Sequence, residues 1–242
     1  MLKYDFLRSS WQNYALALLL GILTLLLGGV LNRDIFLPLI GIYALFFGLY
    51  LYLALRKQQP TTIYFFVAVA ILLRFLLVFS FPNLSDDVYR FIWDGRLLVQ
   101  GVNPFDQLPV YYMEEETGLV GIDRALFERL NSPTYFTIYP PIAQFNFWIA
   151  NAIFPTHLYG ATVLMKLQLF GFEVGAIYLL IQLLRHFELP VQRVLLYALN
   201  PLIIVEIMGN LHFEGAMVCL LLLSVWYMLK QQRTLSAIAF AG

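Results

Sequence analysis

Charged residues are scarce in this chain, and their scarcity excludes an ordinary soluble domain. Asp, Glu, Lys and Arg make up 12% of its 242 residues, against about 25% in typical globular domains. The 15 basic and 15 acidic residues give a formal net charge of zero, so nothing in the composition indicates a nucleic-acid partner. A single cysteine, Cys219 in the apolar run VCLLLL, excludes an internal disulfide and is expected to pack against lipid or another helix.

Long apolar runs dominate the sequence instead. Hydrophobic residues make up 61% of the chain, and the mean hydropathy is +0.75. A run of about 17–25 apolar residues is long enough to span a bilayer as a helix. We therefore predict an all-α fold, a polytopic transmembrane helical bundle, with spans at about 13–31, 35–55, 62–82, 158–184, 194–208 and 214–229. The first run lacks a signal-peptide cleavage site, so we interpret it as a membrane anchor.

Basic residues predict the orientation of the first spans. Short loops rich in Lys and Arg stay in the cytoplasm. Lys3 and Arg8 precede the first span, and Arg56 and Lys57 follow the second. The segment after residue 82 is therefore expected on the extracytoplasmic side.

The apolar run at 142–155 decides the topology of the second half. Arg185 and Arg193 favour a second cytoplasmic loop, which requires residues 142–184 to cross the membrane once. Because the run is only about 14 residues long, it suits a re-entrant segment better than a span. Residues 209–215 then lie outside with the acidic segment. If the run spans fully, every later assignment inverts.

Residues 83–141 form the long polar segment of the chain. It holds nine acids and four bases, a net charge of −5. DDVYRFIWDGRLLVQ (86–100) has the spacing of an amphipathic helix, in which Tyr89 and Trp93 suit a belt at headgroup level. GIDRALFERL (121–130) predicts a second short amphipathic helix. We expect an ordered extracytoplasmic loop whose short helices lie on the membrane surface.

Asp86 and Asp87 stand at the start of this segment and have two interpretations. Ser85 is a natural N-cap, and acids in a first helical turn favourably meet the helix dipole, by about 0.3–1 kcal/mol. Alternatively, one carboxylate is a general base and the other binds a metal or orients substrate. A carboxylate beside an apolar pocket is expected to have a raised pKa, which suits removal of a proton from a sugar hydroxyl.

Arg90, Asp94 and Arg96 follow on the same expected helix. Asp86–Arg90 and Arg90–Asp94 are i,i+4 pairs, so mutual pairing on a helix surface accounts for these residues. The functional alternative is substrate binding, in which an arginine holds a phosphate with its planar fork.

Four ionisable residues lie within or beside the apolar runs: Arg74, Lys166, Glu173 and Glu206. A charge at the bilayer centre costs about 2.5–3.5 kcal/mol on insertion scales, so such residues usually face a bundle interior or a cavity. Pairing between the two bases and the two acids is one interpretation. Contact of Arg74 or Lys166 with the phosphate of a lipid substrate is the other, and the two are compatible.

The segment GNLHFEG (209–215) places polar residues between two apolar runs. His212 and Glu214 are two residues apart and do not share a helix face, which excludes a helical metal motif of the HExxH type. The segment is either a polar cap on a helix end or the lining of a site at a helix break. Together with Asp87, His212 and Glu214 would make a mixed nitrogen and oxygen site for Mg²⁺ or Mn²⁺, although the sequence does not establish a metal.

Three segments, in this order, resemble a known family: LSDDVYRFIWDGRLLVQGVNPF, YPPIAQ and LNPLIIVEIMGNLHFEG. They are similar to the GT-C superfamily of polytopic glycosyltransferases, and most similar to bacterial mannosyltransferase-type members (glycosyltransferase family 87 and relatives of GPI mannosyltransferase I). The resemblance covers about residues 62–230. Two spans precede the helix that leads into the acidic loop here, whereas many members have that loop after their first span.

The resemblance implies an enzyme that moves a hexose, expected to be mannose, from a polyprenyl-phosphate sugar to a lipid or glycan acceptor with inversion. It implies an active site on the extracytoplasmic face of a bacterial inner membrane, with Asp86 or Asp87 as general base. The candidate substrate-binding residues are Arg74, Arg90, Asp94, Arg96, Tyr139, Lys166, His212 and Glu214. Because the chain is short for the family and ends in the apolar stretch SAIAFAG, we expect this single module to be the N-terminal part of a longer protein.

Two other functional classes are alternatives. A transporter or lipid flippase would use the intramembrane charges along a substrate path, but it predicts repeated halves, and the sequence shows no internal repeat. A structural or assembly subunit gives no reason for SDD and GNLHFEG to lie on one face.

Overall fold

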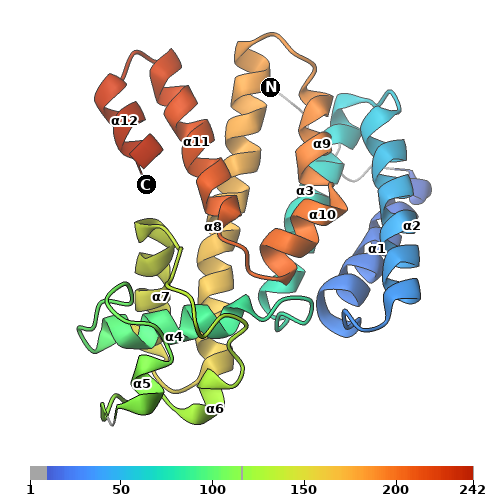
Figure 1. The fold of residues 1–242 in the computed structure, drawn as a ribbon. Coiled ribbons are helices and arrows are strands. Elements are labelled where there is room, and N and C mark those ends of the chain that lie inside the picture. Colours follow the sequence, from blue (N-terminus) through green and yellow to red (C-terminus); the bar gives the residue numbers. More distant parts are fainter. Residues whose placement is uncertain (1–9, 116, 242) are drawn as a thin grey trace.

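The computed structural model describes residues 10–115 and 117–241, and every regular element in these ranges is helical. Four of the described helices are long and apolar enough to cross a membrane. They are α1 (Trp11–Leu25) with its π-helical continuation η2 (Leu26–Val30), α2 (Phe36–Leu55), α3 (Pro60–Val78) and α8 (Leu158–His186). They stand side by side in Figure 1, and the predicted all-α membrane bundle is confirmed. The helix bounds follow the apolar runs because each run ends where polar or turn residues begin.

A broken helix packs beside these four. Its first half contains η3 (Val191–Val194) and α9 (Leu195–Ala198), its second half contains α10 (Pro201–Ile203) and η4 (Ile204–Gly209), and the halves are bent by 48°. Asn200 is the N-cap of the second half: its side-chain oxygen accepts the backbone N–H of Leu202 in the first turn of α10. The chain then continues through α11 (Glu214–Leu229) and α12 (Arg233–Ala241).

A layer of shorter helices covers one end of the bundle (Figure 1). It contains α4 (Asp87–Val99), α5 (Tyr111–Glu114), α6 (Arg124–Phe127) and α7 (Pro141–Ile153). The predicted helix at 121–130 is therefore only the four residues of α6, which Asp123 caps by accepting the N–H of Leu126. The 13 residues of α7 make a helix of about 20 Å, shorter than the ~30 Å hydrocarbon core.

The expectation that Trp93 on α4 belongs to a belt at headgroup level is wrong. Most of this helix is buried, and Trp93 is only 1% exposed, so it does not belong to a headgroup belt. The cause is α7, which packs directly on α4: a side chain at Gly95 would overlap the Asn151 amide and the Phe147 carbonyl of α7. Trp93 instead packs against the rings of Tyr112 and Phe127 in the same layer.

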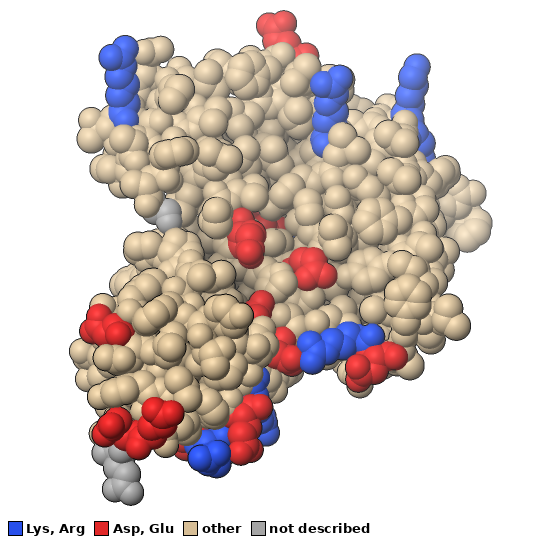
Figure 2. All heavy atoms as spheres, in the orientation of Figure 1, with Lys and Arg blue, Asp and Glu red and all other residues tan. Residues whose placement is uncertain are grey.

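The predicted basic loops gather at the opposite end of the bundle. Gln192 donates to the backbone carbonyls of Ala54 and Arg56, at 2.9 and 2.6 Å. Arg185 donates to the Tyr64 hydroxyl at 2.7 Å. Figure 2 shows groups of basic side chains and an acidic group along the upper edge of the molecule, whereas the middle and lower parts of the same face hold most of the acidic side chains together with other basic ones. The two ends of the bundle therefore differ in charge.

Candidate active site

Two polar turns meet where the short-helix layer joins the bundle. The first, residues 83–87, connects α3 to α4, and the second, residues 210–213, connects η4 to α11. The second turn requires a left-handed backbone at Leu211, whose φ is 63°. The backbone N–H of His212 then donates to the Ile207 carbonyl at 3.1 Å, which folds the turn back over the end of η4.

The structure separates the two neighbouring aspartates. Asp87 points inward: its Oδ1 accepts from the Asn131 amide at 2.6 Å, and its Oδ2 lies 3.4 Å from His212 Nε2. Asp86 points to the rim, where its Oδ2 lies 2.6 Å from Arg33 Nη2. Asp87 is therefore the carboxylate that faces the second polar turn.

His212 bridges two carboxylates. Its Nε2 faces Asp87 and its Nδ1 lies 3.4 Å from Glu206 Oε2. Its Nε2 also lies 3.4 Å from Ser85 Oγ, a hydroxyl that can donate or accept. When both ring nitrogens carry a proton, each can donate to the carboxylate that it faces. The hydrogen bond to Asp87, with the nearby charges of Glu206 and Glu214, accordingly raises the pKa of His212.

The pKa of Asp87 moves the other way from the prediction. The hydrogen bond from His212 lowers it, and this effect, with the Asn131 hydrogen bond, outweighs the rise that burial causes. The expectation of a raised carboxylate pKa is therefore wrong. Its physical reason is the charged partner that the second turn supplies.

Glu206 and Asn131 are parts of the site whose role was not visible in the sequence. Glu206 lies in η4, where Asn210 donates to its Oε2 at 2.9 Å. The position of Glu206 inside an apolar run indicated a functional or paired acid, but its contact with His212 could not be inferred from the sequence. Asn131 lies in a loop far from Asp87 along the chain, and no pattern marks it.

Arg90 and Asp94 form a buried pair that holds the short-helix layer together. Arg90 Nε lies 2.8 Å from Asp94 Oδ1, and its Nη1 donates to the Tyr135 carbonyl at 2.9 Å. The other Asp94 oxygen accepts from Thr137 at 2.5 Å and from Gln144 at 3.0 Å. Burial raises the pKa of Asp94. Mutual pairing, rather than phosphate binding, thus accounts for this pair.

Arg96 is also used for packing. Its Nη1 donates to the Gly121 carbonyl at 2.7 Å, and its side chain packs so closely on Gly121 that an added Cβ would collide with it. Arg96 is buried, and this packing accounts for its position.

Arg74 and Lys166 are fully buried between helices. Arg74 Nε lies 2.7 Å from Glu173 Oε2, which matches the predicted pairing of an intramembrane base with an acid. Lys166 has no carboxylate partner in the described part of the chain. Its Nζ donates to the carbonyls of Leu77, Ser80 and Gly209 at 2.8–3.1 Å, and it therefore joins the ends of α3 and η4 from which the two polar turns start.

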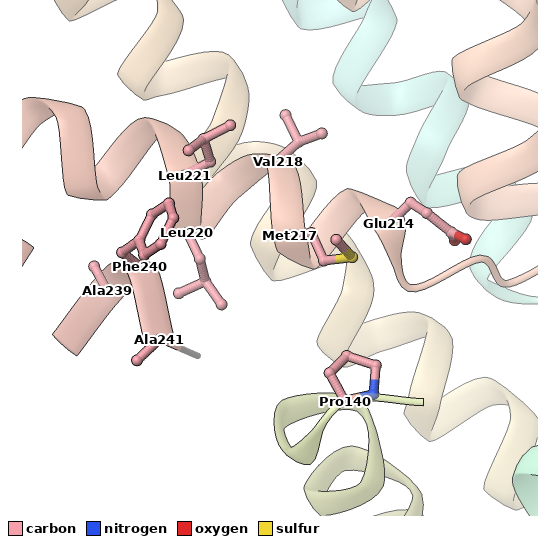
Figure 3. Close-up of a pocket in the computed structure, with 9 residues that line it drawn as sticks. All are labelled: Pro140, Glu214, Met217, Val218, Leu220, Leu221, Ala239, Phe240 and Ala241. Atoms are coloured by element: carbon pink, nitrogen blue, oxygen red, sulfur yellow. The ribbon is translucent and has the colours of Figure 1, made fainter. Parts of the chain in front are cut away.

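Tyr139 and Glu214 lie beside the site. Tyr139 is half-buried, with its ring 4.7 Å from that of Phe91, and burial together with Asp87 raises its pKa, so the hydroxyl stays neutral. Glu214 is exposed at the start of α11. It edges an apolar cavity of about 530 Å³ between α11, α12 and the start of α7 (Figure 3). The cavity is lined by Pro140, Met217, Val218, Leu220, Leu221, Ala239, Phe240 and Ala241.

The geometry does not favour the suggested metal site. Within residues 10–115 and 117–241, no group of three or more His, Cys, Asp or Glu side chains is arranged to hold a metal ion. Asp87, His212 and Glu214 are near one another, but the contacts of His212 are to Asp87 and Glu206.

The comparisons with known proteins agree with this arrangement of motifs. Residues 23–242 match the MptA_B family, described as alpha-(1->6)-mannopyranosyltransferase, N-terminal domain. No curated protein and no solved structure matches the chain. The family match covers nearly all of the sequence and confirms the resemblance to mannosyltransferases, and the apolar helices indicate an integral membrane protein. The chain therefore belongs to the alpha-(1->6)-mannopyranosyltransferase family of membrane glycosyltransferases.

Proposed function

We propose that the chain transfers mannose from a polyprenyl-phosphate donor to a glycan acceptor, with Asp87 as the general base. The observation that carries the proposal is the Asp87 carboxylate, kept ionised by His212 and oriented by Asn131, with 28% of its side chain exposed. An acceptor hydroxyl can reach it there. Asp86, whose oxygen is bound to Arg33, is the less suitable base.

The chemistry suits a base with a low pKa. A sugar hydroxyl becomes strongly acidic only after its oxygen has begun to bond to the anomeric carbon, so a weak base can take the proton late in the step. The phosphate leaving group needs stabilisation of its charge more than protonation. A single displacement inverts the anomeric centre, so an alpha-linked product requires a beta-linked donor.

The apolar cavity supports a lipid-linked donor. It adjoins Glu214, and the protein leaves several lining side chains uncovered, among them Phe240 at 73% exposed and Met217 at 53%. Figure 3 shows these side chains around the gap between α11 and α12. An isoprenoid chain is a suitable occupant, because it is as apolar as the side chains that line the cavity.

The charge distribution supports an extracytoplasmic site. The loops with Arg56 and Arg185 meet at one end of the bundle, and Asp87 and His212 meet at the other. Placing the basic end in the cytoplasm, as the positive-inside rule requires, puts the site outside. The bacterial inner membrane is the proposed location.

Transport is less well supported than transfer. A substrate path would expose the intramembrane charges, but Arg74 is bound to Glu173, and Lys166 is bound to backbone carbonyls, with no exposed surface on either base. These charges have their partners within the bundle instead.

The test is Asp87→Asn in the full chain, reconstituted with a polyprenyl-phosphate mannose and a mannoside acceptor. We expect transfer to fall by at least about 100-fold, the lower range of what a positioned base contributes. Glu128→Gln, which changes an exposed carboxylate of the same layer, is the matched control. Wild-type transfer by Asp87→Asn would show that this carboxylate is not the base.

A further inference from the structure

A phosphate leaving group requires a cation beside it, and Asp87, His212 and Glu206 do not provide a free one. When the bond between the anomeric carbon and the phosphate oxygen breaks, the electron pair stays on that oxygen, and the phosphate charge rises from −1 to −2. A cation that contacts the phosphate stabilises this change more than it stabilises the bound donor. The inference below rests on the proposed donor.

The cations predicted from the sequence do not supply this contact. Arg90 and Arg96 are buried and bound to groups of the short-helix layer. Arg74 and Lys166 are fully buried and bound to Glu173 and to backbone carbonyls. None of these four presents free donors at the rim of the site.

Arg33 is placed differently. It lies in the turn between η2 and α2, and its side chain is 58% exposed. One guanidinium nitrogen, Nη2, is 2.6 Å from Asp86 Oδ2, and the described residues supply no other partner for the guanidinium. Because Asp86 directly precedes Asp87, Arg33 lies on the rim beside the proposed base.

The turn that carries Arg33 is fixed to the acidic turn. Asn83 donates to the carbonyl of Leu31, two residues before Arg33. The Asn83 side chain thus joins the two turns independently of the Arg33–Asp86 pair. Loss of that pair would therefore leave the turns in place and release the guanidinium.

We propose that Arg33 is the phosphate-binding residue of the site and that Asp86 occupies its guanidinium until the donor binds. An exposed ion pair is weak because water screens it. A phosphate offers several oxygens to the planar fork and accepts two parallel hydrogen bonds, so it displaces the single Asp86 oxygen. Arg33 contacts the leaving group and is a catalytic residue.

The transfer step forms one bond, breaks one bond and moves one proton. The acceptor oxygen bonds to the anomeric carbon, and its proton passes to Asp87. The bond from that carbon to the phosphate oxygen breaks, and polyprenyl phosphate leaves with its second negative charge against Arg33. Asp86 binds Arg33 again when the product departs.

The proposal predicts opposite effects for the two partners of one ion pair. Arg33→Gln is expected to weaken binding of polyprenyl phosphate about tenfold, the loss of one charge-assisted hydrogen bond, and to lower kcat further. Asp86→Asn frees Arg33 and is expected to tighten binding severalfold. The double variant is expected to match Arg33→Gln, and Arg33→Lys to recover part of the affinity.

The experiment measures binding of polyprenyl phosphate to the full chain in phosphatidylcholine nanodiscs. The exposed pair Arg124 and Glu128 provides matched controls, since Arg124→Gln and Glu128→Gln break a surface pair of the same layer. Equal losses in Arg33→Gln and Asp86→Asn would indicate a purely structural pair and overturn the proposal. An Arg33→Gln variant within twofold of wild type would do the same.

Two further arms identify the source of the phosphate. Inorganic phosphate is expected to compete only weakly, and phosphatidylglycerol at an equal mole fraction is expected to leave the difference between the variants intact. If phosphatidylglycerol abolishes that difference, Arg33 is a general headgroup contact and the proposal fails. Because binding is measured without transfer, absence of mannosyl transfer by the wild-type chain would refute the proposed function separately.

Discussion

The imidazole of His212 and the carboxylate of Asp87 approach to 3.4 Å, and this contact joins two turns that lie far apart along the chain. The first turn follows α3 and the second follows η4. Lys166 on α8 binds the final carbonyls of both elements. The site is therefore assembled by the packing of three intramembrane elements, and its geometry depends on a residue outside the two turns.

His212→Gln tests whether His212 is protonated in its contact with Asp87, through the pH dependence of stability. The pKa of His212 is raised from 6.5 by Asp87, so its contribution to stability is complete below pH 6.5 and is lost as pH rises through the raised pKa. The pKa of Asp87 is lowered from 3.8 by His212, so its contribution is complete above pH 3.8 and is lost as pH falls through the lowered pKa. The contact therefore stabilises the fold most between these two values.

Thermal unfolding of wild type and His212→Gln across this range is the measurement. We expect the difference in stability to be largest between pH 3.8 and pH 6.5 and to shrink as pH rises to about 8. A difference that is constant over the whole range would mean that His212 is neutral in the folded protein.

Lys166→Met tests whether the hydrogen bonds of Lys166 to the ends of α3 and η4 hold the two polar turns together. Removal of the ammonium leaves buried carbonyls at the ends of α3 and η4 without a donor, at a cost of about 1–3 kcal/mol for each unpaired group. We also expect the two polar turns to separate. Transfer rates of Lys166→Met, His212→Gln and the double variant should then be non-additive, because each single change breaks the same contact. Additive losses would show that Lys166 acts on stability alone.

Properties that depend on local sequence were predictable. The apolar runs specified where the long helices lie, because length and hydropathy alone decide whether a helix can span a bilayer. The pairing of Arg74 with Glu173 was one of the expected combinations, since an unpaired charge in an apolar bundle is costly. The placement of Asp87 and His212 at one end of the bundle followed from treating the run at 142–155 as too short to cross.

Properties that depend on tertiary neighbours were not predictable. Trp93 has the spacing of an interfacial residue but is buried against Tyr112 and Phe127, which no periodicity within α4 could indicate. The pKa of Asp87 was predicted to rise because its apolar surroundings were inferred and its contact with a protonated His212 was not. The role of Arg33 could not be predicted, because the sequence shows only a basic residue in a turn between two apolar runs and not its contact with Asp86.

Arg74→Met tests the buried ion pair. It leaves Glu173 without its cationic partner, with the Tyr197 hydroxyl as a remaining donor, and removal of one partner of a buried pair costs about 3–5 kcal/mol. Replacing both partners, as Arg74→Met with Glu173→Leu, should be less destabilising than Arg74→Met alone, because no charge is then buried. Chemical unfolding in detergent measures both values, and a double variant that is less stable than either single variant would contradict this account.

Single-cysteine labelling tests which side of the membrane holds the site. In a Cys219→Ala background, Glu128→Cys reports on the short-helix layer and Gln59→Cys on the basic end; both positions are exposed. Ala152→Cys, exposed near the end of α7, decides whether that helix crosses. We expect an impermeant thiol reagent added to intact cells to label positions 128 and 152, and to label position 59 only after the membrane is permeabilised. If position 152 behaves like position 59, α7 crosses the membrane, and an extracytoplasmic site shared by Asp87 and His212 is untenable, because the two turns would require opposite sides.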